Sequence, residues 1–277
     1  MLAVLLASVE ANYAGAAPID FYVVDDGIRE QSRKKLEATL KKKIITLHWI
    51  PMAQAIPEGI SLPVVPNSYP LNTYLRLLIP YFLPKHITKA LFLDVDMLVL
   101  GDLGDLWKTD LGAYPVAAVQ DTITRCVGNV GAGGIPNFKE LGLDGESPYF
   151  NAGLQLINIP VWQELGLTEK IMQCIHDHAR HALLGDQYGL NVVLANRWMP
   201  LPPLWNYMAN GDHGSPSLIH FIHRKPFYRS YFNNPLYQRI FYEYLAKTPW
   251  KGTPPIGEST RYLKKLKNVL QKARQMF

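Results

Sequence analysis

Apolar residues recur along this chain at two spacings, one typical of α-helices and the other of β-strands. Helical spacing occurs over residues 2–11, 29–40, 73–82, 168–180 and 185–194. Short apolar runs predict strands over residues 19–24, 44–49, 90–100, 116–120, 150–158 and 217–222. The proline-rich stretch 51–70 predicts an irregular segment, because proline is excluded from helix interiors. Strands that alternate with helices predict an α/β fold, with a mostly parallel mixed sheet flanked by helices.

Two carboxylates, Asp94 and Asp96, lie within the apolar strand predicted over residues 90–100. Side chains alternate along a strand, so both carboxylates would point to one face. Such a pair is unfavourable unless a positive group neutralises it, and hard oxygen ligands suit Mg²⁺ or Mn²⁺. The pair therefore predicts a metal site. The alternative is that both residues lie at a strand end, solvated or hydrogen-bonded to turn amides.

The composition is that of an ordinary globular chain of 277 residues, 48% hydrophobic and 18% charged. No apolar stretch of the sequence is long enough to span a bilayer. Cys126 and Cys174 lack metal-ligand spacing and do not form a disulfide framework, which favours a reducing compartment. The net charge is +5, but residues 261–277 carry +6, so the remaining residues sum to −1. The globular body is therefore not expected to bind nucleic acid.

Several short segments follow one another in a specific order. They are Thr-Tyr-Leu-Arg-Leu at 73–77, Asp-Val-Asp at 94–96, Tyr-Phe-Asn-Ala-Gly at 149–153, Gly-Asp-Gln at 185–187, His-Phe at 220–221 and Lys-Pro-Phe at 225–227. In this order and spacing the set resembles glycosyltransferase family 8, the retaining enzymes similar to bacterial lipooligosaccharide galactosyltransferases and to glycogenin. The resemblance covers residues 1–250 and implies a GT-A-like nucleotide-sugar-binding domain there, with residues 251–277 as a basic tail.

The resemblance implies a metal site of three residues. Asp94 and Asp96 correspond to the family's metal-binding pair, and His220 corresponds to the histidine that completes the coordination by protein. A mixed carboxylate and imidazole set suits Mn²⁺ better than Mg²⁺, which is the alternative. Taken alone, His220 is also explained as a hydrogen-bonded core histidine.

The resemblance also implies a site for a UDP-sugar, with UDP-galactose or UDP-glucose as the donor. The corresponding substrate-binding and sugar-pocket residues are Arg76, Asp94, Asn151, Ala152, Asp186, Gln187 and Lys225. Taken singly, most of these have plainer explanations: an arginine that extends to solvent, a turn residue, a helix N-cap or an exposed loop lysine. Asp121, which follows the strand 116–120, either contacts the acceptor or caps its own loop.

Retention of the anomeric configuration requires either a double displacement or attack on the face from which the leaving group departs. A double displacement needs a nucleophile below the sugar, and the matching residue here is Gln187, whose amide is a poor nucleophile. The resemblance therefore favours same-face attack, in which Gln187 stabilises positive charge on the sugar. Asp186 is assigned to the catalytic site beside it.

The chain departs from the family pattern at two places. The family's first strand, whose Asp-x-Asn-Tyr-like loop holds uracil and ribose, has no counterpart before the amphipathic helix expected over 2–11. Asn12 and Tyr13 follow that helix and are not a substitute. Either the start is mis-assigned or nucleotide binding is weakened. The family's His-Phe-x-Gly-x-x-Lys-Pro pattern is one residue shorter here and lacks its glycine, so His220 and His223 are alternative metal ligands.

The end of the chain combines an apolar stripe with basic residues. The stripe, at three- and four-residue spacing, consists of Leu263, Leu266, Leu270, Ala273 and Phe277. A basic amphipathic helix predicts binding to an anionic membrane surface. The protein would then be cytoplasmic and peripheral at the inner face of the membrane, beside a lipid-linked acceptor. The alternative is a helix that packs on the body or on a second protomer.

The leading hypothesis is a Mn²⁺-dependent retaining enzyme that moves a hexose from a UDP-sugar to a glycan or lipid-linked glycan, as in lipopolysaccharide biosynthesis. A haloacid-dehalogenase-type phosphatase also has Asp-x-Asp after an apolar strand. That family has Thr or Val two residues after the second aspartate, where this chain has Leu98. A relative that binds sugar or membrane without turnover is the other alternative.

Overall fold

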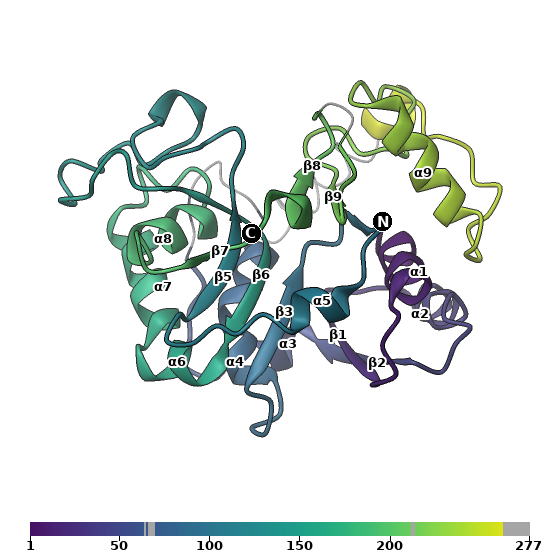
Figure 1. Ribbon diagram of the computed structural model, residues 1–277, viewed down its shortest axis with the longest axis horizontal. Coiled ribbons are helices and arrows are strands. Elements are labelled where there is room, and N and C mark those ends of the chain that lie inside the picture. The colour runs from purple at the N-terminus through teal and green to yellow at the C-terminus, as the bar shows by residue number, and fades with distance from the viewer. Residues whose placement is uncertain (64, 66–69, 212–213, 263–277) are drawn as a thin grey trace, which may run out of the picture.

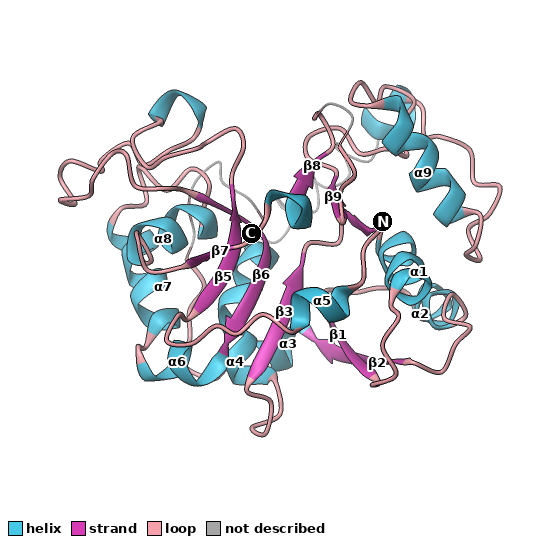
Figure 2. Ribbon diagram, in the orientation of Figure 1, coloured by secondary structure: helices cyan, strands magenta, loops and turns pink. Residues whose placement is uncertain are grey.

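The computed structural model describes residues 1–63, 65, 70–211 and 214–262, and it consists of mixed sheets flanked by helices (Figure 1, Figure 2). The α-helices are α1 (Leu2–Asn12), α2 (Glu30–Glu37), α3 (Met52–Ala55), α4 (Ile79–Phe82), α5 (Leu103–Trp107), α6 (Ile159–Glu164), α7 (Leu167–Asp177), α8 (Asp186–Val193) and α9 (Pro235–Leu245). The 3₁₀ helices are η1 (Leu71–Leu78), η2 (Val130–Ala132) and η3 (Pro203–Asn206). The strands are β1 (Ile19–Asp25), β2 (Ile45–Pro51), β3 (Lys89–Leu93), β4 (Met97–Val99), β5 (Val116–Gln120), β6 (Phe150–Asn158), β7 (Met199–Pro200), β8 (Tyr207–Met208) and β9 (Leu218–His220).

The strands form sheets with the orders β1-β2, β3-β6-β5-β7 and β4-β9-β8. The predicted α/β class with a mixed sheet is confirmed. β6 is antiparallel to both of its neighbours, β3 and β5, whereas β5 and β7 are parallel. The link from β5 to β6 runs through residues 121–149, which contain no α-helix. Antiparallel neighbours need no helical crossover, which is why helix–strand alternation overestimated the parallel pairing.

β6 lies in the middle of the core because both of its faces are apolar. Phe150 and Ala152 belong to a core cluster that includes residues of α7 and α8, whereas Leu154 and Leu156 belong to a cluster that includes residues of α1. Figure 1 shows α6, α7 and α8 gathered on one side of the molecule and α1, α2 and α9 on the other. Every residue of β6 except Asn158 is buried, including the polar Asn151 and Gln155.

Strands β1 and β3 each have one side unpaired within the part of the chain that the structure describes. β1 pairs with β2, and β3 pairs with β6. All five residues of β3 are half-buried although its sequence, Lys-Ala-Leu-Phe-Leu, is almost wholly apolar. A strand side without a neighbour leaves a row of backbone N–H and C=O groups unpaired.

The prediction of one continuous strand over residues 90–100 is wrong. The chain leaves β3 after Leu93, makes a turn in which Met97 N donates to Asp94 O over 3.2 Å, and enters β4. β3 pairs with β6, but β4 pairs with β9, so the chain changes sheets at this turn. Val95, at the tip of the turn, is 56% exposed. The two aspartates therefore lie at a strand end, and the face alternation of a strand does not relate them.

Two predicted helices also differ in character. The helix near the N-terminus is not amphipathic, because every residue of α1 from Ala3 to Glu10 is buried. It is enclosed by α2, β4 and α9, and Glu10 accepts backbone N–H bonds from Lys41 and Lys42. The helix predicted over 73–82 begins as η1 and continues as α4. Among the described residues no helix is long and apolar enough to cross a membrane, and the stripe at 263–277 lies outside them.

Candidate active site

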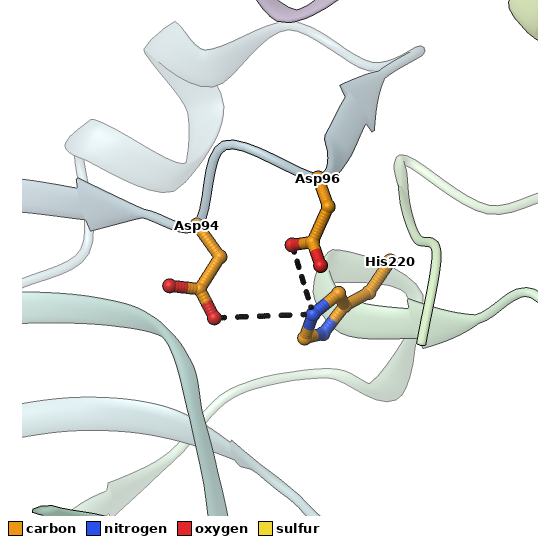
Figure 3. A group of neighbouring side chains, drawn as sticks. All are labelled: Asp94, Asp96 and His220. Atoms are coloured by element: carbon orange, nitrogen blue, oxygen red, sulfur yellow. Dashed lines mark ion pairs between the residues drawn. The ribbon is translucent and has the colours of Figure 1, made fainter. Parts of the chain in front are cut away.

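Asp94, Asp96 and His220 converge where β3, β4 and β9 meet (Figure 3). The two aspartates come from the turn between β3 and β4, and His220 is the last residue of β9, opposite Met97 of β4. His220 Nε2 lies 3.3 Å from Asp96 Oδ1 and 3.9 Å from Asp94 Oδ2. One ligand atom from each residue lies within 4.8 Å of the others, so the group could hold a metal ion.

Two features of this cluster fit a cation. Asp96 Oδ1 is buried and accepts no hydrogen bond from the described residues. Beneath the cluster, Gly153 leaves space that a side chain would fill, since an added Cβ would lie 2.6 Å from His220 Cε1 and 2.9 Å from Asp94 Oδ2. A buried oxygen without a donor is costly, so a cation bound here would compensate it.

The Lys225 ammonium also reaches the cluster. Its Nζ pairs with Asp96 Oδ2 and donates to Phe221 O over 2.6 Å. Burial alone would raise the pKa of Asp96, but His220 and Lys225 together lower it well below its usual range. Asp96 is therefore an anion at neutral pH.

The structure places His220, and not His223, in the cluster. His220 is buried, whereas His223 is exposed. His223 has the left-handed φ of 58°, a conformation rare for residues other than glycine. It stands at the position of the glycine in the family pattern, so the shortened loop keeps a glycine-like turn there.

Arg76 links the cluster of Asp94, Asp96 and His220 to the start of α8. It is buried, so the alternative of an arginine extended to solvent does not hold. Its Nη2 lies 2.9 Å from Asp94 Oδ1, and its Nε lies 2.9 Å from Asp186 Oδ2. Its Nη1 donates to Ala152 O over 2.5 Å, and the guanidinium covers the ring of Phe92. One side chain thus ties four segments of the site together.

Two carboxylates beside Arg76 have raised pKa values. Burial raises the pKa of Asp186 to about 6, and the charge of Asp94 adds to this effect, although Arg76 opposes it. Burial also raises the pKa of Asp94 above its usual range, more than Arg76 and His220 lower it. Arg76 holds its charge more firmly than usual: burial works against it, but the facing aspartates raise its pKa.

The residues expected to line the sugar pocket are linked by hydrogen bonds. Gln187 Oε1 accepts the backbone N–H of Ala152 over 2.9 Å, which fixes the orientation of the Gln187 amide. Asn151 Nδ2 donates to Asp121 Oδ2 over 3.0 Å. Asp121 is buried, and its Oδ1 accepts the backbone N–H groups of Ile123 and Thr124. Asp121 therefore caps its own loop, one of the two roles that the sequence allowed.

Asn206 is a residue of this site that sequence reasoning missed. It ends η3, is 2% exposed, and contacts both Asn151 and His220. A single asparagine after Pro-Pro-Leu-Trp has no spacing or partner in the sequence that would mark it.

The sequence matches the family described as Glycosyl transferase family 8 over residues 1–228. The chain belongs to this family. Membership favours the transferase over the phosphatase alternative, because the same segments that form the site lie within the matched residues. It also confirms the resemblance seen in the sequence.

The chain is similar to several known proteins. General stress protein A of Bacillus subtilis is 26% identical, over 92% of each chain. Glycosyltransferase GlyB of Streptococcus pneumoniae is 27% identical over 75% of this chain, which spans 50% of the length of GlyB. Among solved structures, the bifunctional glycosyltransferase WbbM has 20% identity and a TM-score of 0.74, covering 90% of this chain and 48% of that one. The galactosyltransferase LgtC, solved with donor and acceptor sugar analogues, has 24% identity and a TM-score of 0.70, covering 90% and 91%. These structures establish a GT-A fold.

Proposed function

We propose that this protein is a Mn²⁺-dependent retaining transferase that moves a hexose, galactose or glucose, from a UDP-sugar to a glycan or lipid-linked glycan. The observation that carries the proposal is the Asp94, Asp96 and His220 cluster, whose buried Asp96 Oδ1 has no donor in the part of the chain that the structure describes. Beside it lie Arg76 and Lys225, two cations suited to a diphosphate.

Asp94, Asp96 and His220 would hold the metal, and their mixed oxygen and nitrogen donors favour Mn²⁺ over Mg²⁺. When bound, such an ion supplies positive charge that neutralises a diphosphate leaving group. Asp96 is suited to this role because its lowered pKa keeps it ionised.

Lys225 is the cation of this site that can change partners. Its side chain is 28% exposed and its Nζ binds Asp96 Oδ2. We propose that the Lys225 side chain leaves Asp96 and forms an ion pair with a phosphate oxygen when the UDP-sugar binds. Arg76 is held on several sides by Asp94, Asp186 and Ala152 O, so it would orient the sugar and diphosphate without moving.

Gln187 and Asp186 would act on the sugar. The Ala152 N–H holds Gln187 Oε1, so the amide presents a fixed dipole to developing positive charge on the anomeric carbon. The Gln187 amide is a poor nucleophile, so a double displacement is disfavoured. The acceptor hydroxyl would instead attack on the face from which the phosphate departs, and the departing phosphate would accept its proton. Asp186 pairs with Arg76, and when it is ionised it would add negative charge near the anomeric carbon.

The test is a transfer assay with UDP-galactose and UDP-glucose, Mn²⁺ and a panel of glycan acceptors. We expect UDP release coupled to a new glycoside whose anomeric configuration, read by NMR, equals that of the donor. An inverted product would contradict the retaining mechanism. Release of inorganic phosphate would indicate the phosphatase, and a folded chain with neither activity would indicate the non-enzymatic relative.

We also propose that the protein is cytoplasmic and acts at the inner face of the membrane. The basis is the basic amphipathic pattern of residues 263–277, which carries no acidic residue. Attraction to anionic headgroups would bring the site close to a lipid-linked acceptor.

A further inference from the structure

Asn206 stands between the metal cluster and the sugar-pocket residues, with both ends of its amide in use. Its Nδ2 donates to Asn151 Oδ1 over 2.9 Å, and its Oδ1 lies 3.0 Å from His220 Nδ1. Asn151 Nδ2 in turn donates to Asp121 Oδ2 over 3.0 Å. All four side chains are buried, so each donor must find its acceptor within this chain of contacts.

The direction of every bond in this chain follows from two groups whose roles are fixed. The carboxyl group of Asp121 accepts from Ile123 N and Thr124 N at its Oδ1 and accepts from Asn151 Nδ2 at its Oδ2. A backbone N–H can only donate, and Gly153 N lies 3.0 Å from Asn151 Oδ1, which assigns the same orientation independently. Asn151 Oδ1 therefore faces the Nδ2 of Asn206, and Asn206 Oδ1 faces His220.

The proton on the His220 ring is placed by the same reasoning. Because Asn206 offers only an oxygen to His220 Nδ1, that nitrogen must carry hydrogen. In the neutral ring Nε2 then has a lone pair, and Nε2 is the atom that lies 3.3 Å from Asp96 Oδ1. When a cation takes the place of any hydrogen on Nε2, the Nε2 lone pair and Asp96 Oδ1 face it together, and the cation stabilises this arrangement.

We propose that Asn206 is a positioning residue that selects the metal-binding tautomer of His220 and thereby sets the affinity of the cluster for a transition metal. The inference rests on the proposed metal site and deepens it. Partners behind a metal-bound histidine commonly change metal affinity 10- to 100-fold. Asp121 orients Asn151, Asn151 orients Asn206, and Asn206 thereby selects the tautomer of His220.

The test compares Asn206→Leu, which removes the acceptor for His220 Nδ1, with Asn206→Asp, which keeps an acceptor there and loses only the donor to Asn151 Oδ1. Mn²⁺ affinity of the full chain is measured without substrate, from the electron paramagnetic resonance signal of free Mn²⁺. We expect Asn206→Leu to weaken Mn²⁺ binding about 10- to 100-fold and Asn206→Asp to stay within about threefold of the original protein. Equal weakening by both variants would overturn the proposal, because it would reflect packing alone.

Asn137→Leu is the matched control. Asn137 is also a buried asparagine that contacts a histidine, with its Nδ2 3.4 Å from His178 Nδ1, but it does not touch the cluster. It also accepts a hydrogen bond from Tyr188, so its loss should destabilise the fold without changing Mn²⁺ affinity. A loss of affinity in Asn137→Leu as large as in Asn206→Leu would contradict a specific role for Asn206.

A second measurement keeps the inference testable if Asn206→Leu does not fold. In metal-free protein with ¹⁵N-labelled histidine at pH 8, we expect His220 to carry hydrogen on Nδ1. Hydrogen on Nε2 alone would overturn the proposal. If the original protein binds no divalent metal, the proposed metal site itself fails. If it binds metal but Asn206→Leu binds equally well, only the role of Asn206 fails.

Discussion

At the scale of single residues, the site contains more negatively charged side chains than positively charged ones. Asp94, Asp96 and Asp186 face the cations Arg76 and Lys225. The imbalance is expressed in opposite pKa shifts, since Asp96 is held ionised while the pKa of Asp186 rises to about 6. The free protein thus has a surplus of negative charge suited to a cation.

The raised pKa of Asp186 should be visible in the pH dependence of the free energy of unfolding. Its pKa rises from 3.8 to about 6, so between about pH 4 and pH 6 the folded chain holds a proton that the unfolded chain has lost. Stability from this residue is present at low pH and is lost as the pH rises through this window. Relative to the original protein, Asp186→Asn should gain about 1–3 kcal/mol in free energy of unfolding between pH 4 and pH 7. Chemical denaturation at both pH values measures the difference, and an equal difference at both would contradict the shift.

Gln187→Ala should separate turnover from donor binding. Gln187 Oε1 accepts the backbone N–H of Ala152, and Gln187 is not one of the three residues of the cluster. Its loss should lower turnover about 10²-fold, the cost of removing one oriented dipole, with little change in UDP affinity. Steady-state kinetics and UDP titration test this, and a large loss of UDP affinity would count against the role.

At the scale of elements, the site depends on the turn at which the chain passes from one sheet to another. The sequence could predict β3 and the importance of the two aspartates, but not the turn between them, because the apolar run 90–100 continues through it. It could not predict that Arg76 is buried, since its burial depends on contacts with α8 and β6, far along the chain. Asn206 was missed because its role exists only through long-range partners.

Gly153 in β6 supplies the floor of the cluster, and Gly153→Ala should damage the proposed metal site. Its new Cβ would press on His220 and Asp94, so we expect a loss of about 1–3 kcal/mol in stability and about 10-fold or more in Mn²⁺ affinity. Gly131→Ala is the control, because its Cβ would meet nothing within 4 Å. Thermal unfolding and Mn²⁺ titration of both variants test this, and unchanged affinity in Gly153→Ala would contradict the proposed position of the ion.

At the scale of the whole molecule, the excess positive charge and the candidate active site lie in different parts of the chain. The site lies within residues 76–225, whereas residues 261–277 carry +6 against −1 for the rest. In the described part, Glu258 pairs with both Arg224 and Arg261, so the beginning of the tail at 251–277 contacts the loop that carries Lys225. The fold class, the family and the three residues of the cluster could be predicted from local patterns, and the meeting of two sheets at the site could not.

The tail should bind anionic membranes. Deletion of residues 261–277 should abolish binding to phosphatidylglycerol vesicles, and replacing Lys264, Lys265 and Lys267 by Gln should weaken it about a hundredfold, at about 1 kcal/mol per basic residue. High salt should weaken binding of the full chain, and neutral vesicles should bind little. Vesicle co-sedimentation measures this, and undiminished binding after the deletion would contradict the proposal.

The most direct test of the account is calorimetric titration of UDP into the full chain with Mn²⁺, then with a chelator, beside the Asp96→Asn variant. Asp96 is the carboxylate whose Oδ1 lacks a donor among the described residues and whose charge the site maintains. We predict UDP binding that requires both Mn²⁺ and Asp96. UDP binding that persists in the chelator or in Asp96→Asn, or no binding by a folded chain, would contradict a metal–diphosphate site at this cluster.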